Sequence, residues 1–369
     1  MTDEIDTIVE ESEPAVLTPA TVTLVEGPTF CVSSASGDMA PGAPQGLFFR
    51  DMRVISDWRV RVDGIRPHHL TVLSHDPYRT TFLARVPPHG SQSELLVERT
   101  RYVGEGMRED LTVRNLSPRA ATLAVSVDIG ADFADLFAVK ESRVSSQGEV
   151  TARPDGSVLE FDLHSDAAWR GVRVESEGAR ARPDGLDFRA EVPARGQWRT
   201  TVLVRPSVEQ EHAGGVFPVG VEPAESAPAR RLRAWRENTP HITKIEDPEL
   251  HRTMRRSLED LGALRIFDPA HPEDTAVAAG APWFMALFGR DSLLPPTWLC
   301  PWTRTWHWGP CRRWPGLRAG RSTPPPRNSR DAYSTRRASA WTSRWPAAAA
   351  ASTTGLPTPH RCSSSSSVS

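Results

Sequence analysis

The sequence predicts a multidomain chain in which a β-sandwich is followed by the start of a helical domain. Three observations lead there: short runs with period-two alternation, an apolar stripe at helical spacing after Asp247, and a length of 369 residues, enough for two cores. The expected division is a disordered leader at 1–17, a β-sandwich at 18–206, a linker at 207–240, the first part of the helical domain at 241–294, and an aberrant, disordered tail at 295–369.

The leader, residues 1–17, is acidic and has little apolar content, so we expect it to be disordered. It lacks the basic start and apolar run of a secretion signal. No segment offers the run of about 20 apolar residues that crosses a bilayer. Cys31 is the only cysteine before residue 295, which excludes a disulfide within that part and fits a reducing compartment. We expect a cytoplasmic protein with no membrane partner.

The sandwich is predicted by short alternating runs, each with one buried and one wet face. The runs are Val22–Val25, Val54–Val62, Leu70–Leu73, Leu95–Val103, Leu111–Val113 and Leu123–Ile129. Glycine and proline turns separate strands, at Val62-Asp-Gly64, Asn115-Leu-Ser-Pro118, Pro154-Asp-Gly156 and Pro183-Asp-Gly185. Many short strands with such turns are typical of a sandwich.

The helical domain is predicted from Asp247-Pro248 onward, because Asp caps orphan amide hydrogens and Pro tolerates the first helical position. An apolar stripe follows at Leu250, Met254, Leu258, Leu261 and Leu264. A short helix at Ala229–Arg236 is expected within the linker. A stripe without partner helices would favour aggregation, so a chain ending near Pro206 is expected to stay better dispersed than the full chain.

The charge distribution excludes a nucleic-acid surface. Residues 295–369 hold 11 Arg, no Lys and one acidic residue, leaving 33 basic and 45 acidic residues in 1–294. An acidic body cannot displace counterions from phosphates. His68, His69 and His75 lack carboxylates or cysteines at metal-ligand spacing, and no dinucleotide or phosphate-loop fingerprint occurs. We therefore expect neither a metal nor a cofactor.

Two motifs carry a family resemblance: Gly46-Leu-Phe-Phe-Arg-Asp-Met-Arg53, and Pro282-Trp-Phe-Met-Ala-Leu-Phe-Gly-Arg-Asp-Ser-Leu293. With them the chain resembles bacterial and archaeal glycogen debranching enzymes of the amylo-α-1,6-glucosidase type. The resemblance implies an all-β super-sandwich followed by the start of an all-α (α/α)6 six-hairpin glycosidase barrel. It also implies hydrolysis of α-1,6 branch bonds in a glycogen-like α-glucan.

The resemblance implies that Arg290 and Asp291 bind hydroxyls of the substrate sugar. A carboxylate can accept two sugar hydroxyls while a guanidinium fork orients it, and Trp283 offers a flat face for the sugar. In the alternative interpretation, Arg290 and Asp291 form a structural pair and Trp283 is a core residue. For Arg50 and Asp51, within the sandwich, a structural ion pair is the expected role.

The tail differs in composition from everything before it: seven of the twelve Trp fall in 295–369, with Pro, Ala and Ser clusters and no Ile, Phe or Lys. A GC-rich gene read out of frame gives such a composition, which predicts a frameshift near Leu294–Trp298. DNA sequencing through codons 290–300 tests this.

The general acid and base of the family would lie later in the barrel, so the catalytic residues are unknown and this chain is expected to be truncated and inactive. The competing hypothesis is a glycan- or protein-binding module, which would need an exposed row of aromatic residues on one sheet face. The sequence does not determine the oligomeric state.

Overall fold

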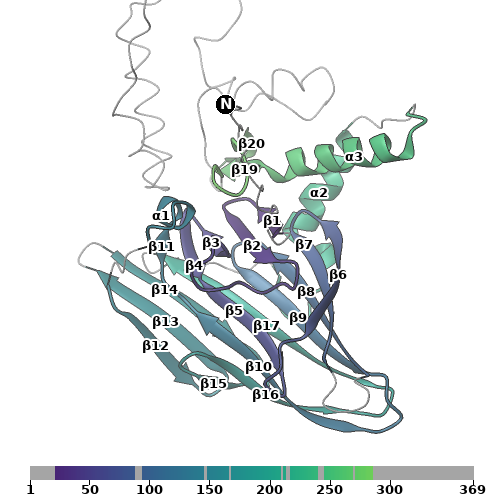
Figure 1. Ribbon diagram of the computed structural model, residues 1–369. Helices are drawn as coiled ribbons and strands as arrows, with labels where there is room; N and C mark the ends of the chain where they lie inside the picture. The colour runs from purple at the N-terminus through teal and green to yellow at the C-terminus, as the bar shows by residue number, and fades with distance from the viewer. Residues whose placement is uncertain are drawn as a thin grey trace, which may run out of the picture.

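The computed structural model describes residues 21–87, 94–144, 148–165, 168–208, 211–212, 217–239, 245–268 and 271–285. It is mostly β-structure, as the sequence predicts, and antiparallel sheets form a layered sandwich with the helices gathered at one end (Figure 1). The leader and the tail fall outside the described residues.

One layer of the sandwich is a broad antiparallel sheet, here called sheet C. Its order is β12 (Val150–Asp155), β13 (Val158–Ser165), β14 (Ala168–Glu175), β17 (Gln197–Val208), β9 (Met107–Asn115), β8 (Leu95–Val103), β7 (Arg79–Arg85) and β6 (His68–Asp76), with β18 (Glu211–His212) paired to β17. The strand β17 runs past Pro206, where the predicted sandwich ends.

The opposing layer consists of two smaller sheets. Sheet A has the order β1 (Thr21–Glu26), β2 (Thr29–Ser34), β3 (Gly46–Phe49), β4 (Met52–Ile55) and β11 (Ala134–Asp135). Sheet B has the order β15 (Arg180–Arg182), β16 (Gly185–Val192), β10 (Ala121–Gly130) and β5 (Asp57–Val62).

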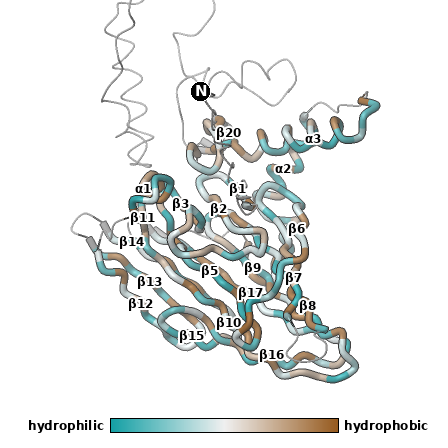
Figure 2. The backbone as a smooth tube through the Cα atoms, in the orientation of Figure 1, coloured by the Kyte–Doolittle hydropathy of each residue, from teal (hydrophilic) through white to brown (hydrophobic). Residues whose placement is uncertain are grey.

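The main core fills the space between these layers, and strand alternation builds it. In β5 and in most of β16, successive residues alternate between the buried core and the surface, as period-two pleating requires. Figure 2 shows the same alternation of apolar and polar residues along the strands. The core draws on all three sheets, for example Leu47 of sheet A, Val125 of sheet B and Leu111 of sheet C.

The strand β6 departs from this pattern, because Leu70 and Leu73 are about half exposed. The run Leu70–Leu73 predicted a strand with one buried face, and the strand is present, but β6 is the last strand of sheet C and nearly all of its residues are exposed. Bulges interrupt its pairing with β7 after His69 and after Ser74, which twists the edge away from further pairing.

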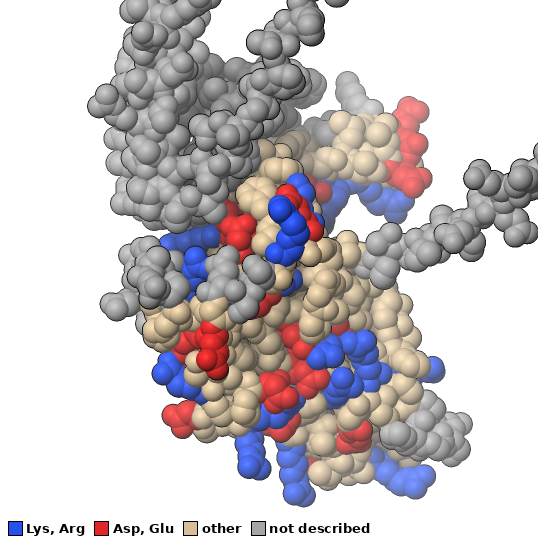
Figure 3. Space-filling view, turned by 60° about the vertical axis from the view of Figure 1, so that its left-hand side comes forward, with Lys and Arg blue, Asp and Glu red and all other residues tan. Residues whose placement is uncertain are grey.

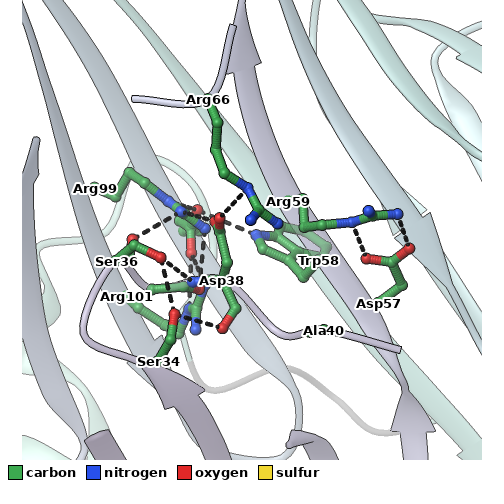
Figure 4. Close-up of polar contacts among 12 residues, drawn as sticks. Ser34, Ser36, Asp38, Ala40, Asp57, Trp58, Arg59, Arg66, Arg99 and Arg101 are labelled. Atoms are coloured by element: carbon green, nitrogen blue, oxygen red, sulfur yellow. Dashed lines mark hydrogen bonds and ion pairs between the residues drawn. The ribbon is translucent and has the colours of Figure 1, made fainter. Parts of the chain in front are cut away.

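A fully buried charged network crosses the main core between β8, β9 and the loop after β2 (Figure 4). Arg99 Nε donates to Glu109 Oε1 at 2.8 Å, and Arg101 Nε donates to Glu109 Oε2 at 2.7 Å. Arg99 also reaches Asp38 Oδ1 at 2.6 Å, and the indole nitrogen of Trp58 donates to Glu109 at 3.2 Å. Every charge here has a partner of opposite sign, which offsets the cost of removing these groups from water.

The outer face of sheet A carries a second core. A short helix, α1 (Leu136–Lys140), and the hairpin β19 (Arg265–Asp268) with β20 (His271–Val277) lie over this face. The buried members are Val25, Phe30, Val32, Phe48, Ala134, Leu136, Val139, Ile266, Ala278 and Met285. Sheet A is therefore covered on both faces, and residues 264–285 supply part of the cover.

The helix α2 (Ala227–Asn238), preceded by the short 3-10 turn η1 (Pro223–Glu225), packs on the sandwich through a third cluster. This cluster joins Tyr78, Tyr102 and Phe217 to Ala229, Leu232 and Trp235. Arg236 of α2 forms ion pairs with Asp76 of the sandwich at 3.0 Å and with Glu259 of the next helix at 2.9 Å. The segment 217–239, expected as a connector with a short helix, is thus fixed on both sides.

The helix α3 (Pro248–Ala263) begins as predicted: the Asp247 side chain accepts hydrogen bonds from the backbone amides of Glu249 and Leu250. Its apolar stripe is divided. Leu261 packs on the third cluster and Leu264 on the second core, whereas Leu250 is 50% and Met254 39% exposed. The start of a helical barrel remains a prediction, because α2 and α3 are the only α-helices in the described part of the chain after the sandwich.

Candidate functional site

The first motif forms the β3–β4 hairpin, and most of its residues have a structural reason. Gly46 has φ of 147°, and a Cβ atom there would lie 2.5 Å from the Ile55 carbonyl oxygen, so only glycine fits. Leu47 and Phe49 face the main core, whereas Phe48 between them faces the second core. The motif therefore places one apolar residue after another on alternate faces of a sheet that is buried on both sides.

Arg53, the last residue of the motif, is buried and links neighbouring segments through hydrogen bonds. Its Nε lies 3.1 Å from both Asp132 carboxylate oxygens, and its Nη1 donates to the carbonyl oxygens of Ala43 and Gln45 at 3.0 and 3.1 Å. The Arg53 side chain is only 3% exposed. A guanidinium with this many acceptors is held in one position, so Arg53 fixes the 132–135 segment against the hairpin.

Arg50 and Asp51 form the two-residue turn between Phe49 and Met52, with φ of 49° and 61°. A hairpin turn with two positive φ values favours Asn-Gly, and each L-residue with a side chain pays on the order of 1–2 kcal/mol in this conformation. The Arg50 guanidinium carbon lies 5.1 Å from the centroid of the Phe49 ring. The turn is therefore strained, and strain of this kind is often found where side chains have a specific role.

Asp51 is 8% exposed, and its backbone carbonyl accepts a hydrogen bond from the Leu136 amide at 3.0 Å. Burial, and next the nearby Asp135 carboxylate, raise the pKa of Asp51 to about 6. An ion pair with Arg50 would lower that pKa instead. The structural ion pair expected for Arg50 and Asp51 stays a prediction.

The second motif is described only as far as Met285, so Arg290 and Asp291 lie outside the described residues. Trp283 is half buried, and its indole meets the Phe48 ring edge to face with centroids 6.1 Å apart. The neighbouring Phe284 is 40% exposed, and the Lys140 ammonium of α1 lies 4.6 Å from its ring centroid. The structure therefore brings the start of the second motif onto the sheet that carries the first. The sugar-binding role of Trp283, Arg290 and Asp291 stays a prediction.

The outer faces of the sandwich carry charge pairs where a glycan-binding module would carry aromatic residues. Trp58 is fully buried, and Trp198 packs edge to face on Phe188 at a centroid distance of 5.6 Å. On sheet B, Asp128 pairs with Arg61 and Arg182 at 2.9 and 2.5 Å. Figure 3 shows acidic and basic side chains in adjacent small groups on the face it presents. In the described part of the chain, no row of exposed aromatic residues lies on a sheet face.

The remaining expectations concern metals and membranes. Within the described ranges, no group of three or more His, Cys, Asp or Glu side chains could hold a metal ion, and His68, His69 and His75 lie on the exposed strand β6. None of the helices in those ranges is long and apolar enough to cross a membrane.

Sequence reasoning missed the polar partners of the first motif. Asp132 and Asp135 lie about 80 residues after the hairpin and had no local signal, because their contacts with Arg53 and Asp51 depend on β11 pairing with β4. The Asp135 side chain also caps α1 by accepting from the Phe137 amide at 2.9 Å. The uninterrupted apolar run Leu47-Phe48-Phe49 was the only signal that could have placed this hairpin in a sheet covered on both faces.

Comparison with known proteins agrees with the resemblance in the sandwich. No curated protein matches the chain. Among solved structures, the Slr1438 protein from Synechocystis sp. PCC 6803 aligns with a TM-score of 0.33 and 9% identity, covering 52% of this chain and 97% of that chain. Residues 24–203 match the family model of the N-terminal domain of (some) glycogen debranching enzymes. This match, which spans both layers of the sandwich, supports the glycogen-debranching family for this chain.

Proposed function

We propose that this chain is part of an enzyme type that hydrolyses α-1,6-glucosidic branch bonds in glycogen or a related glucan, with the sandwich as a non-catalytic support, and that this chain is itself truncated before the general acid and base and inactive. The observation that carries the proposal is the match of residues 24–203 to the N-terminal domain of debranching enzymes. Because residues 24–203 resemble an N-terminal domain, which precedes the catalytic domain, we assign the chemistry to the residues after the sandwich.

The charges of the sandwich support this division of roles. Hydrolysis of a glycosidic bond uses two carboxyl groups on opposite sides of the bond, roughly 6.5–9.5 Å apart when the configuration is inverted. The buried carboxylates of Glu109 and Asp162 and the partly exposed carboxylate of Asp132 are each bound by arginine. A carboxylate held in an ion pair neither donates a proton readily nor activates water.

The sugar contacts are proposed for Arg290, Asp291 and Trp283. Asp291 would accept hydroxyl hydrogens, Arg290 would orient it, and the exposed part of Trp283 would lie against the sugar. The partial exposure of Trp283, which packs against the second core, supports this, because part of its ring remains available for a ligand. No metal or cofactor is required for this chemistry.

The proposal is tested by binding, using an α-1,6-branched dextrin and, as a control ligand, a β-linked cellodextrin. The full chain is expected to bind the branched dextrin and to ignore the cellodextrin in calorimetric titration. Hydrogen bonds to a charged group contribute about 1.5–3 kcal/mol, so Asp291→Asn should weaken binding by roughly 10- to 100-fold.

Asp247→Asn is the matched control, since it also replaces a carboxylate by an amide while keeping a residue that caps a helix. It is expected to leave the dextrin affinity unchanged. Equal affinity for the two glucans, or equal loss in the two variants, would contradict the proposal.

A further inference from the structure

A pocket lies at the junction of the sandwich, the two helices and the β19–β20 hairpin, in the region between β1, α2 and β19 in Figure 1. The sandwich contributes Glu26, the last residue of β1, while α2 contributes Arg231 and β19 contributes Arg265 and Phe267. The pocket is partly open to solvent, and its enclosed part has room for about one water-sized group. It can therefore hold one small end of a ligand.

Aromatic rings hold two guanidinium groups at this pocket. The guanidinium carbons of Arg231 and Arg265 lie 5.0 and 5.2 Å from the centroid of the Phe267 ring. The Arg265 carbon also lies 4.6 Å from the centroid of the Trp235 ring. A cation on a ring face is held without the use of its N–H donors, so hydrogen bonds decide what else these two groups bind.

The hydrogen bonds of the two arginines go to acceptors of different charge. Arg231 donates from Nε to Oε1 of Glu26 at 3.1 Å, and its Nη2 donates to the same oxygen. Arg265 donates from Nε to the Gly262 carbonyl at 2.9 Å and from Nη2 to the Arg231 carbonyl at 3.3 Å. Glu26 thus balances the charge of Arg231, whereas the acceptors that Arg265 binds are neutral.

The groups at this pocket carry more positive than negative charge. Burial lowers the pKa of Arg265 to about 10, and Arg231 adds to this shift while the Glu26 carboxylate opposes it. With this pKa the guanidinium is still charged at pH 7. Two cations and one carboxylate line the pocket, so a negative group that enters it is attracted and a metal ion is repelled.

We propose that this pocket binds the oxyanion end of a small ligand, a carboxylate or phosphate group, through the guanidinium groups of Arg231 and Arg265. A guanidinium presents five N–H donors in a planar fork that matches either oxyanion, and the two carbonyl bonds use two of the five in Arg265. Trp283 is not among the described residues that line this pocket, so the inference does not rest on glucan binding.

Calorimetric titration of the full chain at pH 7.5 tests the site, with inorganic phosphate and acetate as separate probes at constant ionic strength. At least one probe is expected to bind with millimolar affinity, and the comparison shows which oxyanion the site prefers. Arg265→Gln should weaken this binding by roughly 10-fold or more, because it removes both the charge and the fork of donors.

Arg233→Gln is the matched control. Arg233 is exposed on α2 and, like Arg265, donates to a backbone carbonyl, that of Ala224 at 3.2 Å. Its replacement should leave the affinity for the probes unchanged. Absence of binding by both probes would overturn the proposal. Binding that both variants weaken equally, or that neither weakens, would mean an adventitious ion only and would overturn it as well.

NMR of the arginine Nε–H groups gives a second readout that does not depend on the folding of a variant. In the unaltered chain, titration with the probe should shift the Arg231 and Arg265 signals together, with the dissociation constant found by calorimetry. The Arg233 signal should stay in place. A shift of the Arg233 signal as large as that of Arg265 would contradict a site in this pocket.

Discussion

The Trp283 indole packs edge to face on the Phe48 ring, with 6.1 Å between the centroids. This contact joins the start of the second motif to the middle of the first. It lies in a core on the outer face of sheet A, so the sandwich is completed by residues that follow it in the chain by more than 50 positions. Several properties of the protein depend on that arrangement.

A chain shortened at Pro206 is expected to aggregate more than one ending at Met285. The cut interrupts β17 and removes the cover from Phe30 and Phe48 on sheet A. It also uncovers Tyr78 in the turn between β6 and β7, and Tyr102 of β8. Exposing each large apolar side chain to water costs about 1.5–3 kcal/mol of burial free energy, which favours association. Light scattering of 1–206 and 1–285 at equal concentration measures the difference.

The sequence alone predicted that a chain ending near Pro206 would stay better dispersed than the full chain, and that comparison stays a prediction. The second core is the reason to expect that 1–206 aggregates more than 1–285. If 1–206 stayed as monodisperse as 1–285, the cover supplied by residues 217–285 would not matter for solubility.

Leu250→Gln with Met254→Gln is expected to reduce aggregation of the full chain without lowering Tm. These two residues are the exposed half of the α3 stripe, and polar replacements there remove apolar surface without opening a core. Leu261→Gln is the contrasting variant, because Leu261 packs on the third cluster. Leu261→Gln should lower Tm. A similar decrease of Tm in the Leu250→Gln, Met254→Gln variant would mean that a partner buries these two residues in solution.

Gly262→Ala is expected to destabilise the α2–α3 junction, although alanine is ordinarily the better helix former by about 1 kcal/mol. A Cβ atom at Gly262 would lie 2.7 Å from the Trp235 indole, which donates a hydrogen bond to the Leu258 carbonyl at 2.8 Å. Overpacking of this kind costs about 1–3 kcal/mol. Hydrogen exchange of α3 amides should speed up in this variant.

Ser257→Ala, exposed on the same helix, is the control and should slow exchange or leave it unchanged. Slower exchange in Gly262→Ala would show that α3 does not pack closely on Trp235.

Glu109→Gln is expected to change how stability depends on pH. Burial would raise the pKa of Glu109, but the adjacent Arg101 and Arg99 outweigh it and lower that pKa to about 2. Because the folded value lies below the ordinary 4.5, this carboxylate stabilises the fold above pH 4.5 and loses its contribution as the pH falls towards 2. The contribution is on the order of 3 kcal/mol at about 1.4 kcal/mol per pKa unit.

Denaturant unfolding from pH 7 to pH 2.5 tests this. The Gln variant should be destabilised by roughly 3–5 kcal/mol at pH 7, since two buried guanidinium groups lose their shared carboxylate, and should show a flatter profile below pH 4.5. An unchanged slope below pH 4.5 would mean that Glu109 does not carry the acid sensitivity.

Local pattern determined a large part of the fold. Alternation along Asp57–Val62 and Leu123–Ile129 shows which side chains face the core, because each strand's pleat fixes its two faces regardless of its partners. Asp247-Pro248 determined where α3 begins for the same reason, since a cap is a contact within one turn of the chain. The two motifs were also readable as sequence and pointed to the debranching family.

Tertiary structure alone decided which charges meet and which faces are covered. Glu109 is bound by two arginines because β8 lies beside β9, and Asp51 lies next to Asp135 because β11 pairs with β4. The same holds for Leu250 and Leu261, which are equivalent in the stripe of one helix while only the second finds a partner. These outcomes depend on contacts between segments far apart in the chain, and the alternation within any one segment carries no information about its distant neighbour.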